Sequence, residues 1–196
     1  MPEMLTVDEV NDLDQRRFVE RFGSLYESSP WVAEEAWRGR PFGDLRELHE
    51  AFARAVYEAP RERQMDLIQA HPDLAGKAAV AGELTPESTS EQASAGLDRL
   101  TPQEYEAFTE MNTGYREKFG FPMIVCAREH TKMPSTADET PTITKETILQ
   151  NARDRLKNSR EEEIEVALGE IAKIARFRLE DLVETDEAPP ENQARK

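Results

Sequence analysis

Apolar residues recur along the chain at intervals of three and four, which is the spacing of an amphipathic helix. The first series runs from Val10 to Leu25 and predicts one helix that begins near Thr6 or Asn11. Segments that alternate apolar and polar residues, as a strand would, are almost absent. The pattern therefore predicts an all-α fold, a single-domain helical bundle of about eight helices. After the first helix, the others are expected at 31–37, 45–56, 62–70, after Thr85, 102–119, 143–156 and 164–182.

Several helix ends are marked by their residue types. Threonine followed by proline, at 85–86 and at 101–102, is typical of an N-cap with proline in the first helical position. Gly120 and Pro122 predict the end of the helix that starts at Pro102. Two capping boxes are expected, Thr101 with Glu104 and Ser159 with Glu162.

Three segments fit no helix by pattern alone. The apolar run 121–127 is either a buried extended segment or the start of a helix. Residues 132–141 are a polar loop with prolines at both ends. The end of the chain, 185–196, is polar and predicts a disordered tail or linker after a domain that covers 1–184.

Composition and charge narrow the function classes. The 196 residues are 38% hydrophobic and 33% charged, which suits one domain with a charged surface. The net charge of −15 repels phosphate backbones and anionic lipids, so neither nucleic acid nor a membrane is an expected partner. Residues 1–7 lack the basic start and apolar stretch that we expect of a signal peptide. Cys126 is the only cysteine, and we interpret it as a small buried hydrophobe. We expect a cytoplasmic protein.

The acidity itself has two interpretations. Forty acidic residues against 25 basic ones are typical of a protein from a salt-rich cytoplasm, where ions screen self-repulsion. The same excess is also ordinary solubility charge, and the sequence leaves both open.

His71 is the first candidate for chemistry. Pro72 pushes the residue before it out of the α region, so His71 must lie at a helix boundary. A histidine there can present a ring nitrogen to a ligand, and the small residues Ala75 and Gly76 let that ligand approach the backbone. The alternative is a structural histidine at a helix C-terminus. The other two histidines, His49 and His130, are expected to be surface residues.

A row of polar and small residues forms the second candidate. On a helix, Ser88, Glu91, Gln92 and Ala95 share one face, and its polar side chains can hydrogen-bond a planar polar ligand. The alternative is a solvated helix face.

Arg178 is the third candidate. It continues the apolar stripe of the last helix, whereas Arg176 projects away from it. An arginine on a buried face needs an anion, because an unpaired buried charge is costly. That anion is either a structural carboxylate or a substrate carboxylate held bidentately.

Four blocks together resemble the OHCU decarboxylase family, which acts in urate degradation on 2-oxo-4-hydroxy-4-carboxy-5-ureidoimidazoline (OHCU). The resemblance covers residues 8–183 in order. The blocks are His71-Pro72-Asp73-Leu74-Ala75-Gly76, Ser88-x-x-Glu91-Gln92-x-x-Ala95-Gly96-Leu97, Tyr115-x-x-Lys118-Phe119-Gly120-Phe121-Pro122-Met123-Ile124, and Ile171-Ala172-x-Ile174-x-x-x-Arg178-Leu179.

The resemblance implies an all-helical homodimer that needs no cofactor and no metal and converts OHCU to (S)-allantoin and carbon dioxide. Members of this family also occur fused to urate oxidase, so the resemblance implies fusion or functional association with that enzyme, which the tail at 185–196 would allow. The implied catalytic residues are His71, Glu91 and Arg178. The implied substrate-binding residues are Pro72, Ser88, Gln92, Phe121, Met123, Ile124 and Val125.

Two rival hypotheses stay open at this point. In one, the chain is a non-catalytic helical interaction domain in which His71 and Arg178 are structural. In the other, it is a metal-dependent ureide hydrolase with His71, Asp73 and Glu91 as ligands.

Overall fold

A computed structural model describes residues 4–76, 82, 84–130 and 144–185. Within these ranges the chain forms nine α-helices, one short 3₁₀-helix and an isolated bridge in place of any sheet. The predicted all-α class is confirmed. The expected polar loop at 132–141 and nearly all of the expected tail lie outside the described residues, so the boundary after residue 184 stays a prediction.

The contacts group the chain into two units. The first contains residues 1–58 and 175–196, and the second contains residues 59–174. Helix α10 (Arg160–Glu180) supplies residues to both, since the division falls after Ile174.

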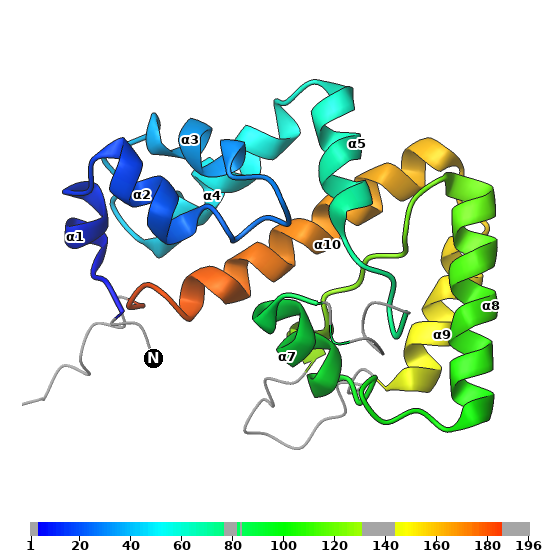
Figure 1. Cartoon of the computed structure of the whole chain (residues 1–196). Helices are drawn as coiled ribbons and strands as arrows, with labels where there is room; N and C mark the ends of the chain where they lie inside the picture. The colour runs from blue at the N-terminus through cyan, green and yellow to red at the C-terminus, as the bar shows by residue number, and fades with distance from the viewer. Residues whose placement is uncertain (1–3, 77–81, 83, 131–143, 186–196) are drawn as a thin grey trace, which may run out of the picture. The chain divides into compact units, whose positions relative to one another are not determined.

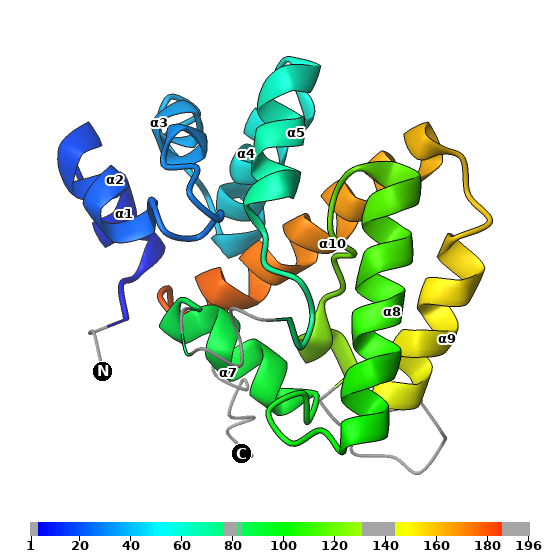
Figure 2. The ribbon, with the colours of Figure 1, turned by 45° about the vertical axis from the view of Figure 1, so that its right-hand side comes forward.

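The first unit contains the helices α1 (Val7–Asn11), α2 (Gln15–Phe22), α3 (Trp31–Trp37) and α4 (Leu45–Tyr57). Helices α2, α3 and α4 lie side by side in Figures 1 and 2. Their core is aromatic: the Phe18 ring stacks on Phe52 at 5.7 Å, and Tyr26 stacks on the same ring at 6.1 Å. The first helix expected from the pattern is divided in two. Asp14 caps the backbone amide of Arg17 and begins α2 there, while the apolar spacing continues across the break.

The second unit contains α5 (Arg61–Ala70), α7 (Pro86–Ser94), α8 (Pro102–Phe119), the 3₁₀-helix η1 (Ala127–His130), α9 (Lys145–Arg155) and the first part of α10. Helices α8 and α9 run side by side in both ribbon views (Figures 1 and 2). The largest side chains buried in this unit come from α5, α8 and the segment after α8: Leu67, Ile68, Phe108, Tyr115, Phe119, Phe121 and Met123.

The predicted helix ends are largely confirmed. Thr85 and Thr101 are N-caps followed by proline, and both capping boxes form. The box at Ser159 begins α10 at Arg160, earlier than its apolar stripe suggested. Gly120 ends α8 with φ of 80°, a left-handed conformation that glycine adopts without steric cost.

Candidate active site

His71 caps the C-terminus of α5, as Pro72 predicted. Its backbone is extended, with φ of −71° and ψ of 140°, and its side chain is buried. The ring nitrogen Nδ1 lies 2.9 Å from the carbonyl oxygen of Leu67, one turn back in the same helix. Since a carbonyl can only accept, the neutral ring carries its proton on Nδ1, and Nε2 is the basic nitrogen. The ring is therefore fixed in one tautomer.

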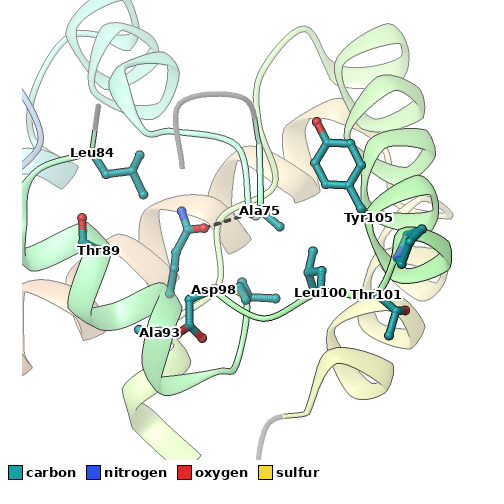
Figure 3. A pocket seen from close by; sticks show the side chains of 11 residues that line it. Ala75, Leu84, Thr89, Ala93, Asp98, Leu100, Thr101 and Tyr105 are labelled. Atoms are coloured by element: carbon teal, nitrogen blue, oxygen red, sulfur yellow. Dashed lines mark hydrogen bonds between the residues drawn. The ribbon is translucent and has the colours of Figure 1, made fainter. Parts of the chain in front are cut away.

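The loop after His71 is held by side chains from two helices. Gln92 of α7 accepts the backbone amide of Ala75 at 2.9 Å, the bond drawn in Figure 3, and its own amide group reaches the Asp73 carbonyl at 3.4 Å. Asn112 of α8 donates to the Leu74 carbonyl at 2.9 Å. Three successive residues of the loop are thus fixed from outside. The observed partners of Gln92 belong to the loop, and its expected contact with substrate stays a prediction.

Charge also ties the loop to α8. The Asp73 carboxylate accepts from Nε of Arg116 at 2.9 and 3.2 Å. This pair is half exposed, so solvent screens it and we assign it orientation rather than much stability. Among the described residues, no group of three or more histidine, cysteine, aspartate or glutamate side chains is placed to hold a metal ion.

The polar face of α7 is not a solvated face. Ser88, Gln92 and Ala95 are 5%, 8% and 6% exposed, and Glu91 is half-buried between them in sequence. A pocket of about 350 Å³ lies on a neighbouring side of the same helix, where Thr89 and Ala93 form one wall (Figure 3). Gln92 also lines this pocket. The opposite wall contains Leu100, Thr101 and Tyr105.

Residues 121–126 form no helix, and the 3₁₀-helix η1 begins at Ala127, the last residue of the apolar run. Phe121 stacks on Phe119 at 5.8 Å, and Phe121 through Ile124 are all buried. The backbone amides of Met123, Ile124 and Val125 donate to no acceptor among the described residues. Met123 and Ile124 are buried and Val125 is half-buried, and buried amides are nearly always satisfied, so these donors are candidates for binding a ligand.

Arg178 lies in the first unit and is 5% exposed, whereas Arg176 is exposed, as the stripe predicted. One of its nitrogens donates to the Leu25 carbonyl at 3.1 Å and lies 3.5 Å from Oε2 of Glu27. A structural carboxylate is therefore present beside this arginine. Bidentate binding of a substrate carboxylate by the same group stays a prediction.

Comparison with known proteins gives the family. The family model for OHCU decarboxylase matches residues 11–180. A 2-oxo-4-hydroxy-4-carboxy-5-ureidoimidazoline decarboxylase from Halalkalicoccus jeotgali is 42% identical over 178 residues, covering 91% of this chain and 92% of the relative. The chain belongs to the OHCU decarboxylase family.

Two further relatives place this family member in context. The uric acid degradation bifunctional protein PucL of Bacillus subtilis is 38% identical over 180 residues, which are 92% of this chain but 33% of PucL. A solved structure described as (S)-allantoin synthase superposes with a TM-score of 0.63 at 25% identity, covering 91% of this chain and 54% of the other. The same domain thus occurs alone and within longer chains.

Sequence reasoning missed two carboxylates that the structure of this OHCU decarboxylase family member places beside candidate groups. Glu27 contacts Arg178, and no pattern within its own segment distinguished it. Glu163 lies fully buried on α10, where it accepts from Arg155, the residue that also contacts the Ile124 carbonyl. Its place one turn before Ala167, which is fully buried on that helix, was a signal that it faces inward.

Proposed function

We propose that this chain decarboxylates 2-oxo-4-hydroxy-4-carboxy-5-ureidoimidazoline to (S)-allantoin and carbon dioxide in urate catabolism, by acid–base catalysis without a cofactor. The family match over residues 11–180 is the observation that carries the proposal. The fixed tautomer of His71 supports it, as do the amides of Met123, Ile124 and Val125, which donate to no acceptor among the described residues.

For this reaction the protein must orient the substrate and supply a proton. Breaking the bond to the carboxylate leaves an electron pair on the ring carbon, and the adjacent C=N or C=O system of the substrate accepts it. A proton must then be delivered from one face to the neighbouring ring carbon, which bears the ureido group. The carbon that lost the carboxylate becomes a carbonyl as its hydroxyl gives up a proton, and the product is (S)-allantoin. The residues must hold the scissile bond perpendicular to the ring plane and place the donor.

In this proposal His71 moves protons, since an imidazole titrates near neutral pH and its Nε2 is the basic nitrogen. Glu91 orients the imidazole. Arg178 binds the substrate anion or the oxyanion charge that develops. Ser88, Gln92 and the amides of Met123, Ile124 and Val125 hold the ureidoimidazoline, and Pro72 and Phe121 line its faces.

Stereochemistry tests the activity. OHCU decays spontaneously to racemic allantoin, so the purified chain is added to freshly oxidised urate and the optical signal of (S)-allantoin is followed. An enantiomeric excess that grows with enzyme concentration supports the proposal, and a racemic product refutes it. Activity that a chelator abolishes would instead support the metal-dependent hydrolase.

His71→Asn tests the assignment of the proton-transfer residue. We expect (S)-allantoin formation to fall by at least about 100-fold, the usual contribution of a general acid–base group. His49→Asn, in α4, is the matched control and should retain wild-type rates. A His71→Asn rate within about tenfold of wild type would show that another group moves the proton.

Location and assembly complete the proposal. No helix among the described residues combines the length and apolar composition that crossing a bilayer needs. We propose a cytoplasmic homodimer that associates functionally with urate oxidase, on the strength of the family resemblance and the bifunctional relative. Light scattering on the eluting protein should give twice the chain mass of 22.3 kDa, and the monomer mass would contradict the dimer.

A further inference from the structure

The backbone of residues 121–126 is held in place by side chains of other segments. It is buried except at the half-buried Val125, and it pairs with no strand in the part of the chain that the structure describes. Instead, side chains from two other helices form hydrogen bonds with its backbone. Arg155, the last residue of α9, donates through Nη1 to the Ile124 carbonyl at 2.8 Å, and Glu170 of α10 accepts the Cys126 amide at 2.7 Å. The amides for which the described residues offer no acceptor lie between and beside these two attachment points.

Arg155 is itself held in place by a buried carboxylate. Its Nε and Nη2 donate to Oε1 of Glu163 at 2.9 and 2.5 Å. The Arg155 side chain is 13% exposed and the Glu163 side chain is fully buried. Because a guanidinium is planar and rigid, two bonds to Glu163 fix the direction of the third nitrogen, which points to Ile124.

Several hydrogen bonds fix the position of the Glu163 carboxylate. Besides Arg155, it accepts from the Tyr115 hydroxyl and, through Oε2, from Asn158 at 2.9 Å. Burial raises the pKa of the Tyr115 phenol well above its ordinary value, so this hydroxyl stays protonated and donates. The carboxylate is thus anchored by groups from α8, the turn after α9 and α9 itself.

Glu163 and Glu170 stand seven residues apart on α10, which is two helical turns, so both carboxylates project from the same side. One acts on Ile124 through Arg155 and the other acts directly on Cys126. Together they fix the backbone direction across two peptide units.

We propose that Arg155, held by Glu163, is a positioning residue that aims the backbone amides of Met123, Ile124 and Val125 at the substrate. Arg155 does not touch the substrate. Its effect is on substrate binding, because misdirected amides weaken the hydrogen bonds to the ureidoimidazoline. The proposal rests on the proposed function, since it assigns those amides to that substrate.

Arg155→Lys is the informative variant. Lysine keeps the positive charge that Glu163 needs, but a single ammonium cannot reproduce the rigid fork between Glu163 and the Ile124 carbonyl. We expect KM to rise about tenfold with kcat within about threefold of wild type. Tenfold is about 1.4 kcal/mol, the size of one hydrogen bond. Arg153→Lys, at an exposed position two residues earlier on α9, is the matched control and should leave both parameters unchanged.

Variants of Glu170 provide a second, independent test. Glu170→Ala removes the acceptor for the Cys126 amide and should raise KM, whereas Glu170→Gln keeps an acceptor oxygen and should restore it. This arm decides the question if Arg155→Lys fails to fold. Hydrogen exchange on peptides covering 122–127 should be faster in Arg155→Lys and in Glu170→Ala than in wild type, and added (S)-allantoin should slow it in wild type more than in either variant.

The outcomes separate the two proposals. If wild type gives racemic product, the proposed function fails whatever the variants do. If wild type gives (S)-allantoin but Arg155→Lys and Glu170→Ala both keep KM within about twofold while lowering the melting temperature, the cluster is only structural and the positioning role is refuted.

Discussion

Removal of the Glu163 carboxylate is the sharpest test of how the second unit is stabilised. In Glu163→Ala, the buried Arg155 guanidinium loses its partner, and the Tyr115 hydroxyl and the Asn158 amide lose their acceptor. Breaking a buried ion pair on one side costs about 3–5 kcal/mol, because the remaining charge is left without compensation. Arg155 is only 13% exposed, so water can recover little of that cost.

The loss should be visible as a fall in melting temperature of about 6–20 °C, at about 2–4 °C per kcal/mol for a chain of this length. Urea denaturation gives the free energy of unfolding directly, provided the slope against urea concentration is unchanged. The double variant Arg155→Ala/Glu163→Ala should lose less than the sum of the single losses, since the two groups are coupled.

Glu165→Ala is the matched control on the same helix. Its carboxylate is 60% exposed and lies 3.5 Å from Arg61, so its removal should cost less than about 1 kcal/mol. A Glu163→Ala loss of similar size would refute the reasoning, because it would mean that the buried carboxylate contributes no more than a surface ion pair.

Three further predictions follow from local features. Gly76→Ala should lower the melting temperature by the equivalent of about 1–3 kcal/mol, because its new Cβ would lie 2.7 Å from the Asp73 Cβ and the loop must shift. The pKa of the Glu104 carboxyl lies below its ordinary 4.5, mainly because the Thr101 amide and then Lys145 hydrogen-bond to it. Its contribution to stability is therefore fully present above pH 4.5 and is lost as the pH falls through the lowered pKa. Glu104→Gln should remove this part of the acid dependence of stability. With 40 acidic and 25 basic residues, the melting temperature should rise between low and molar salt as screening grows, and a flat curve would rule out adaptation to a salt-rich cytoplasm.

The fold could be predicted from the sequence wherever the signal was local. The Thr-Pro pairs, the capping boxes and Gly120 each act within four residues, and each ends or begins a helix where expected. The break between α1 and α2 was missed for the opposite reason. Val10 and Phe18 both belong to the core, so the apolar spacing runs through the break, and only the cap at Asp14 marks it.

The candidate site could be predicted only in part. Pro72 placed His71 at a helix end by covalent sterics, and the stripe of α10 placed Arg178 on a buried face. The partners of these groups come from distant segments: Glu27 is 151 positions from Arg178 in the numbering of the chain, and Tyr115 is 48 from Glu163. Residue spacing along a single helix carries no information about such pairs.

The loop after His71 shows why small and polar residues occur there together. Ala75 has a φ of 50°, which costs free energy in any residue with a Cβ, and Gly76 passes too close to Asp73 for a side chain. A loop so shaped cannot satisfy its own backbone, and Gln92 and Asn112 supply the missing partners at Asp73, Leu74 and Ala75. The path of the backbone therefore explains why Ala75 and Gly76 are small, and no ligand beside them is needed to explain it. In the proposed function, the loop gives a rigid base directly after His71, whose ring is already fixed by the Leu67 carbonyl. In that proposal, the Leu67 carbonyl holds the imidazole and the supported loop holds the backbone after it, as proton transfer to one face of a substrate requires.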